Sequence, residues 1–192
     1  VFTSGATFSA AENQTAIGTV TATDVDTDNS SITFSVSGSE LSITSGGILR
    51  FINAPDYETK TTYTATVTAS DGTNTTNQNI TVNVTNINDN APIFTSSGSF
   101  SVNENQTNIG SVAVNDADGD TLSYSLSGTD ASSMSINSSS GALTFNSAPD
   151  YETKTSYSAT VTASDGTNST SQNITITIAV SYTHLRAHET SP

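Results

Sequence analysis

The chain contains an internal repeat, and this repeat limits the folds that its 192 residues can form. Residues 54–61 return without any change as residues 148–155, an offset of 94. Residues 12–15 return as residues 104–107, an offset of 92, and the small difference in offset is expected to lie in loops, where insertions cost little. The sequence therefore predicts two tandem copies of one domain.

The copies set the expected domain boundaries. We expect a first domain at residues 1–91 that ends in a linker at 86–92, and a second domain at 92–180. Residues 1–4 match residues 93–96, which follow Pro92, so the chain is expected to be a piece of a longer array of such domains. Residues 181–192 break the pattern and resemble translated adapter or vector sequence, so we expect a non-native or disordered tail there.

Each copy alternates apolar and polar residues with a period of two, which is typical of half-buried strands. Two stripes of this kind occur in the first copy, one at residues 63–70 and one at 80–85, and the second copy repeats them at 157–164 and 174–178. With the shorter alternations, they give about seven strands per copy and no helical period. The expected fold class is all-β, with two tandem seven-stranded immunoglobulin-like Greek-key β-sandwiches.

Composition excludes several classes of function. Acidic residues outnumber Lys and Arg by 18 to 4, so the chain repels phosphate backbones and nucleic acid is not an expected partner. The sequence has no Cys, which excludes disulfides and Cys catalysis, and it has no apolar run of the roughly 20 residues that a membrane helix needs.

The carboxylates fall at the ends of expected strands. In an extended segment the side chains at i and i+2 point the same way, so Asp56 with Glu58, and Asp116 with Asp118, are each expected to present oxygens together. Acids packed in this way repel one another by about 1 kcal/mol per close pair even in water, and a hard divalent cation relieves that repulsion. Calcium is preferred, because it accepts six to eight oxygen ligands in loose geometry. The acids expected to meet at the junction of the copies are Glu12, Asp56, Glu58, Asp89, Asp116, Asp118 and Asp165.

These motifs resemble a known family. The Glu of the first strand, the Asp-x-Glu loop, the hinge Asn-Asp-Asn-Ala-Pro, the Asp-x-Asp loop and the motif Ala-Ser-Asp-Gly are similar to those of cadherin-type repeats, in the bacterial style. The resemblance covers residues 1 to 180 and implies three calcium ions at the junction. It implies an outer ion on Glu12, Asp56, Glu58 and Asp89; a second on Glu12, Glu58, Asp89, Asp118 and the carbonyl of Ile87; and a third on Asn88, Asp116, Asp118, Asp165 and the carbonyl of Asn90.

The chain departs from the family at the first hinge position, where Asn86 stands in place of the usual Asp. An amide oxygen can still be a ligand, but one negative charge is missing. We therefore expect weaker binding of the second ion, on the order of 10⁻⁴ to 10⁻³ M. The outer ends of the two copies carry half-sets of ligands that await a further hinge: Asp24, Asp26, Asp71, Glu104, Asp150 and Glu152.

The resemblance implies a calcium-rigidified extracellular segment of a larger bacterial surface or secreted adhesin, acting as a spacer or in cell adhesion. Its expected partners are calcium ions, neighbouring repeats of the same chain and a cell-surface protein or polysaccharide. The alternative is a carbohydrate- or partner-binding module of a secreted protein. Strand-exchange adhesion of the vertebrate kind is not expected, because the chain has no Trp.

We do not expect an enzyme. Both histidines, His184 and His188, lie in the tail, so Ser-His chemistry and a zinc centre lack their residues. Asp56 and Glu58 are a conceivable glycosidase pair, but their recurrence in both copies favours ligation. A His-containing metal or sorting tail and glycosylation at triplets such as Asn79-Ile80-Thr81 stay open alternatives.

Overall fold

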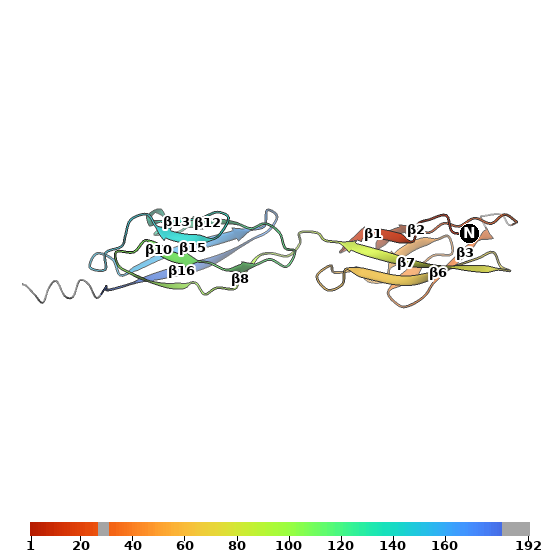
Figure 1. Cartoon of the computed structure of the whole chain (residues 1–192), viewed down its shortest axis with the longest axis horizontal. Helices are drawn as coiled ribbons and strands as arrows, with labels where there is room; N and C mark the ends of the chain where they lie inside the picture. Colours follow the sequence, from red (N-terminus) through yellow and green to blue (C-terminus); the bar gives the residue numbers. More distant parts are fainter. Residues whose placement is uncertain (27–30, 182–192) are drawn as a thin grey trace, which may run out of the picture. The chain divides into compact units, whose positions relative to one another are not determined.

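The computed structural model describes residues 1–26 and 31–181, and the regular secondary structure of these residues is almost entirely β-strand (Figure 1). The chain divides into two compact units, Val1–Ile87 and Asn88–Pro192, so the division falls inside the segment 86–92. Of the tail expected at 181–192, only Ser181 is described, and residues 182–192 lie outside the described residues. Within the described ranges, no helix is long and apolar enough to cross a membrane.

The first unit is a sandwich of two sheets, as the period of two predicted. Its four-stranded sheet has the order β1-β7-β6-β3 and its three-stranded sheet the order β2-β5-β4. In this unit β1, the first strand, pairs parallel to β7, the last strand, and all other strand pairs are antiparallel. The strands are β1 (Thr7–Ala11), β2 (Ala16–Thr19), β3 (Thr33–Val36), β4 (Leu41–Ile43), β5 (Ile48–Phe51), β6 (Thr62–Ser70) and β7 (Thr75–Thr85).

The second unit repeats this topology, with sheets of order β12-β15-β16-β9 and β10-β14-β13. It adds the two-residue strands β8 and β11, whose pairing corresponds to an isolated bridge between Phe2 and Ala22 in the first unit. The elements are β8 (Ile93–Phe94), β9 (Ser99–Asn103), β10 (Asn108–Ser111), β11 (Val114–Asn115), β12 (Ser123–Ser127), the 3-10 helix η2 (Ala131–Ser133), β13 (Met134–Ile136), β14 (Ala142–Phe145), β15 (Ser156–Ser164) and β16 (Ser169–Ala179).

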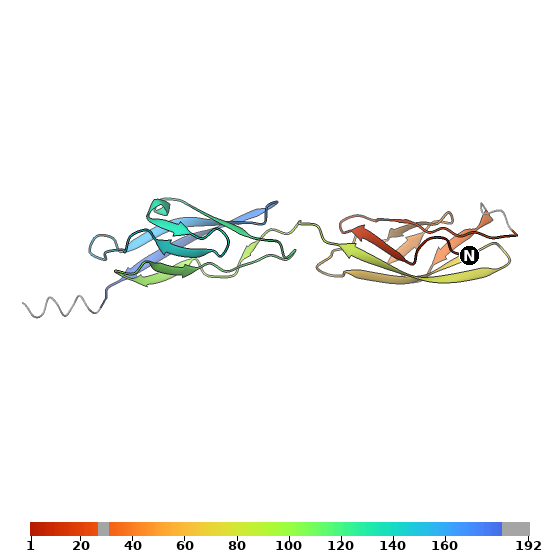
Figure 2. The ribbon, with the colours of Figure 1, turned by 45° about the horizontal axis from the view of Figure 1, so that its top comes forward.

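The predicted stripes form the core of each sandwich, which confirms the fold class. The inward residues of the two long strands are almost fully buried, among them Val67 and Val82 in the first unit and Val161 and Ile176 in the second, each at 0% exposure. Their neighbours in sequence are Thr, Ser and Asn on the opposite face. The long strands β6 and β7 pair with each other along the whole of β6, and Figure 2 shows the ribbon from a second angle.

Candidate metal centres

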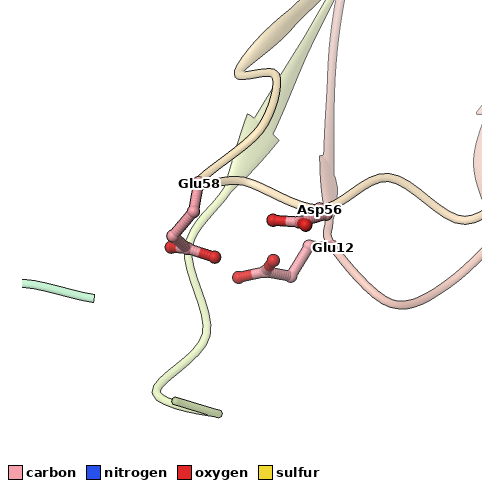
Figure 3. Close-up of side chains that lie close together, drawn as sticks. All are labelled: Glu12, Asp56 and Glu58. Atoms are coloured by element: carbon pink, nitrogen blue, oxygen red, sulfur yellow. The ribbon is translucent and has the colours of Figure 1, made fainter. Parts of the chain in front are cut away.

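The first unit gathers three carboxylates from two segments. Glu12 directly follows β1, and Asp56 and Glu58 lie in the loop before β6. Each of the three offers an oxygen within 4.8 Å of the others, and Figure 3 shows their carboxylates facing one another. Three like charges at this spacing repel, so the arrangement stabilises a bound cation.

The loop that carries Asp56 and Glu58 is a turn, and the expectation of an extended segment is wrong here. The N–H groups of Thr59 and Lys60 donate to the carbonyl of Asp56 at 3.3 and 2.9 Å, as in the first turn of a helix. The Asp56 carboxylate caps this turn, because it accepts the Thr59 N–H at 3.2 Å and the Thr59 hydroxyl at 2.8 Å. The Thr59 hydroxyl is the main cause of a lowered pKa at Asp56, which keeps this ligand ionised.

Glu12 is the buried member of the group, with 2% exposure. One carboxylate oxygen accepts the N–H of Tyr57 and the other accepts the N–H of Ile87, both at 2.8 Å. One side chain therefore holds both the Asp-x-Glu turn and the last residue of the first unit. Each of its oxygens keeps a further lone pair that a cation can use.

A second group of carboxylates follows β11 in the second unit. Asp116, Asp118 and Asp120 each offer an oxygen within 4.8 Å of the others. Asp120 was not expected from the sequence, although the run Asp-Ala-Asp-Gly-Asp continues the i, i+2 spacing that identified the first two. Partial desolvation, followed by the charges of Asp116, Asp118 and Asp165, raises the pKa of Asp120.

The second half of the hinge bonds to this group. Asp118 accepts the backbone N–H groups of Asp89 and Asn90 at 3.0 and 2.8 Å, and it also accepts the side-chain amide of Asn90 at 2.9 Å. The amide of Asn88 lies beside the next loop, where it donates to the carbonyl of Asp165 at 3.3 Å. The hinge residues expected as ligands thus lie among the acids of their own unit.

Asp165 is a buried acid with 9% exposure. One of its oxygens accepts the N–H groups of Asn168 and Thr167 at 2.6 and 2.7 Å. Burial acts to raise the pKa of Asp165, but these bonds outweigh it and the pKa is lowered. Among the described residues, none makes a hydrogen bond to the second oxygen, Oδ2, of Asp165 or to the buried Oδ2 of Asp116.

Each unit holds a part of the expected ligand set. In the first unit Glu12, Asp56 and Glu58 meet and Ile87 bonds to Glu12, while Asn86 is exposed. The corresponding group of the second unit, Glu104, Asp150 and Glu152, also lies within 4.8 Å, and Glu104 accepts the N–H of Ser181 at 2.9 Å. The remaining ligands expected from the sequence, Asn88, Asp89, Asn90, Asp116, Asp118 and Asp165, lie together in the second unit.

The donor set of these groups fits a hard cation. All side-chain candidates are carboxylates or amides, and thiolate and imidazole are absent from the groups. A buried carboxylate oxygen without a hydrogen-bond donor is costly, and a cation satisfies it directly. The mixture of carboxylates, amides and carbonyls suits calcium better than magnesium, which demands a tighter octahedron.

The chain is similar in sequence to known proteins over most of its length. The sequence model of the cadherin domain matches residues 6–85 and 98–181. Human protocadherin Fat 4 is 36% identical over 163 residues, which cover 77% of this chain and 3% of that protein. Mouse cadherin EGF LAG seven-pass G-type receptor 2 is 33% identical over 165 residues, which cover 79% of this chain and 6% of the receptor. The chain thus spans a small part of the length of these relatives.

Solved structures show the same fold. Mouse cadherin-23 EC22-24 aligns with a TM-score of 0.79 at 23% identity, covering 94% of this chain and 64% of that chain. Human protocadherin-24 EC1-2 aligns with a TM-score of 0.72 at 24% identity, covering 92% and 94%. At these identities the likeness concerns the fold alone.

Proposed function

The chain belongs to the cadherin domain family, whose domains are typically extracellular, calcium-dependent adhesion repeats, and on that premise we propose that it is a calcium-binding segment of a larger surface protein. Its domains act as adhesion modules rather than as enzymes. The observation that carries the proposal is the pair of buried carboxylate oxygens, on Asp116 and Asp165, that have no donor among the described residues. Such oxygens are destabilising unless a cation binds them.

The ligand sets follow from the family resemblance and the groups within each unit. Calcium supplies positive charge that several oxygens share, and the protein supplies those oxygens in place of water. The outer set is Glu12, Asp56, Glu58 and Asp89; the middle set is Glu12, Glu58, Asp89, Asp118 and the Ile87 carbonyl; the inner set is Asn88, Asp116, Asp118, Asp165 and the Asn90 carbonyl.

The hinge connects the two groups of ligands through one peptide bond. Ile87, which donates to Glu12, is followed directly by Asn88, which donates to the carbonyl of Asp165. Ligands on both sides of that bond would share cations, so binding would restrict rotation about the hinge and stiffen the array. Removal of calcium would restore repulsion among the carboxylates and free the hinge.

Small-angle scattering of the full chain, with millimolar calcium and with EDTA, tests this proposal. We expect EDTA to broaden the distribution of distances while circular dichroism keeps most of the β signal. The variant Asp116→Asn with Asp165→Asn is the matched control: it removes two acids of the inner set alone, so its scattering should change less between calcium and EDTA than that of the parent chain. Identical scattering of the parent chain in calcium and EDTA would contradict the proposal.

We also propose the finer context: the segment is a spacer in a bacterial surface or secreted adhesin, located outside the cell. The motif resemblance supports the bacterial assignment. An acidic composition without Cys is compatible with an extracellular bacterial setting. Fractionation of cells that express the full-length parent protein tests the location, and recovery of that protein in the cytosol would contradict it.

A further inference from the structure

The two units carry the same Asp-x-Glu turn, at residues 56–60 and 150–154, and each turn ends in a lysine. The backbone N–H of Lys60 donates to the carbonyl of Asp56 at 2.9 Å, and that of Lys154 donates to Asp150 at 3.0 Å. Both ammonium groups also lie over a tyrosine ring, at 4.4 and 4.7 Å from its centre. The chemistry of the two turns is thus matched.

The acidic partners of the two lysines differ. Lys60 pairs with Glu40 at 2.5 Å, and the Glu40 side chain is 51% exposed. Lys154 pairs with Asp130, whose side chain is 13% exposed. The two lysines themselves are equally exposed, at 41 and 40%, so the difference lies in the partner. An ion pair with a sheltered partner is less screened by water and salt than one with an exposed partner.

Asp130 is in turn fixed to the sheet. Its second carboxylate oxygen accepts the N–H of Ser158 in β15 at 2.8 Å, and its own N–H donates to the Ser158 carbonyl at 3.0 Å. The pKa of Asp130 is lowered, mainly by the hydrogen bond from Lys154 and next by the one from the Ser158 N–H. This anchor therefore remains charged. Asp130 therefore links the lysine to a strand whose position the core determines.

In the described part of the first unit, no backbone N–H of a strand donates to the carboxylate of Glu40, although the Ile52 N–H donates to its backbone carbonyl at 2.9 Å. Thr64 is the counterpart of Ser158 at the same offset as the repeated turn, yet the carboxylate of Glu40 bonds to Lys60 and not to Thr64. The two copies also differ in the length of one loop. Residues 129–133 separate Gly128 from Met134, whereas residues 39–40 separate Gly38 from Leu41, and Asp130 belongs to the longer loop.

We propose that Lys154 and Asp130 are positioning residues that hold the second Asp-x-Glu turn in its metal-binding shape, and that the first turn is held less firmly. The calcium part of this inference rests on the proposed function, whereas the rigidity of the metal-free turn does not. Outer partners that orient ligands typically change metal affinity by about 10 to 100-fold when removed. Because Lys154 is half-exposed, we expect an effect near the lower end of that range.

The first experiment is native-state hydrogen exchange of the full chain in EDTA, read by NMR at two matched amides. The Lys154 and Lys60 N–H groups make the same bond at nearly the same distance, so the strength of the tether is the main difference between them. We expect the Lys154 amide to exchange at least threefold more slowly than the Lys60 amide, and Lys154→Met to remove that difference. Equal protection in the parent chain would overturn the proposal.

The second experiment separates positioning from simple electrostatics. Lys154→Met removes a positive charge and Asp130→Asn removes a negative one, but both break the same ion pair. If the pair positions the turn, both variants lower calcium affinity at Glu152, by roughly tenfold. If the pair acts only through its charge, Lys154→Met raises the affinity and Asp130→Asn lowers it.

The matched controls lie in the first unit. Lys60→Met and Glu40→Gln should change the affinity read at the Glu58 amide by less than about twofold, given the exposure of their pair. A melting curve in EDTA identifies any variant that fails to fold. If Lys154→Met fails, the calcium affinity of Asp130→Asn decides the test, because this variant keeps an acceptor for the Ser158 N–H. If calcium does not shift the NMR signals of the Glu58 and Glu152 amides in the parent chain, the proposed function is contradicted. If Lys154→Met and Asp130→Asn change the calcium affinity in opposite directions, only the positioning role is contradicted.

Discussion

Glu12 offers the sharpest test of how the first metal centre is built. Its carboxylate accepts two backbone N–H groups, from Tyr57 and Ile87, each at 2.8 Å. The residue is buried, with 2% exposure. The variant Glu12→Gln keeps one acceptor oxygen and turns the other into a donor, so one N–H loses its partner. Leaving a buried donor unsatisfied costs about 1–3 kcal/mol. In a domain of this size, each kcal/mol lowers the melting temperature by about 4–8 °C.

Differential scanning calorimetry in EDTA measures this cost without any bound metal. We expect Glu12→Gln to lower the transition of the first unit by at least about 4 °C and to speed exchange of the Tyr57 or Ile87 amide. Glu58→Gln makes the same change of charge at an exposed position of the same group, so it separates the lost hydrogen bond from the lost charge. We expect that variant to be neutral or slightly stabilising, because it removes repulsion.

The second unit provides an internal replicate of the same experiment. Glu104 is also 2% exposed and accepts the N–H of Ser181 at 2.9 Å. Glu104→Gln should therefore lower the transition of the second unit and leave the first unchanged. Melting temperatures within 1 °C of the parent for Glu12→Gln, together with unchanged exchange at Tyr57 and Ile87, would refute the reasoning.

Two further outcomes follow from the hinge and from Asp130. Asn86→Asp adds one negative charge at the hinge, and the attraction between two opposite unit charges 4 Å apart in water is about 1 kcal/mol. Calorimetric titration should therefore show calcium binding tightened by roughly fivefold, and unchanged or weaker binding would contradict the role given to Asn86. The pKa of Asp130 is lowered from 3.8 by Lys154 and then by the Ser158 N–H, so its stabilisation is present above the unfolded-state pKa and is lost as the pH falls through the lower folded-state pKa. An NMR titration of the Asp130 carboxyl with a midpoint at or above 3.8 would show that the ion pair does not hold.

The period of two and the repeat were sufficient to predict the fold. Side chains alternate across a strand by geometry, so the stripe ending at Ala69 and the stripe from Ile80 to Val84 could only bury one face. The positions of Glu12 and Asp56 after and before strands also follow from this pattern. The comparison of the copies further predicted that the same groups would occur twice, as they do at Glu12 and Glu104.

The details of the metal groups depend on contacts that a period cannot reveal. The turn at residues 56–60 forms because the Asp56 carboxylate bonds to Thr59, a local competition between side chain and extended backbone. The dual bonding of Glu12 joins residues 45 and 75 positions away in sequence, which only the folded chain brings close. Asp130 lies in a loop that is longer in the second copy than in the first, so the repeat gave no template for its contacts.

The distribution of charge also decides whether ordinary salt can replace calcium. Among the described residues, Arg50 in β5 is the charged residue that lies within a strand. The acids lie outside the strands, and many of them form groups with oxygens within 4.8 Å of one another. The Debye length is about 8 Å at 0.15 M salt and about 3 Å at 1 M, so physiological salt leaves the repulsion within a group largely intact. Sodium chloride at 1 M should therefore raise the melting temperature in EDTA, but less than millimolar calcium does at 0.15 M, because screening supplies no ligand bond to the buried oxygens of Asp116 and Asp165. Equal melting temperatures under the two conditions would mean that calcium acts on this chain by charge alone.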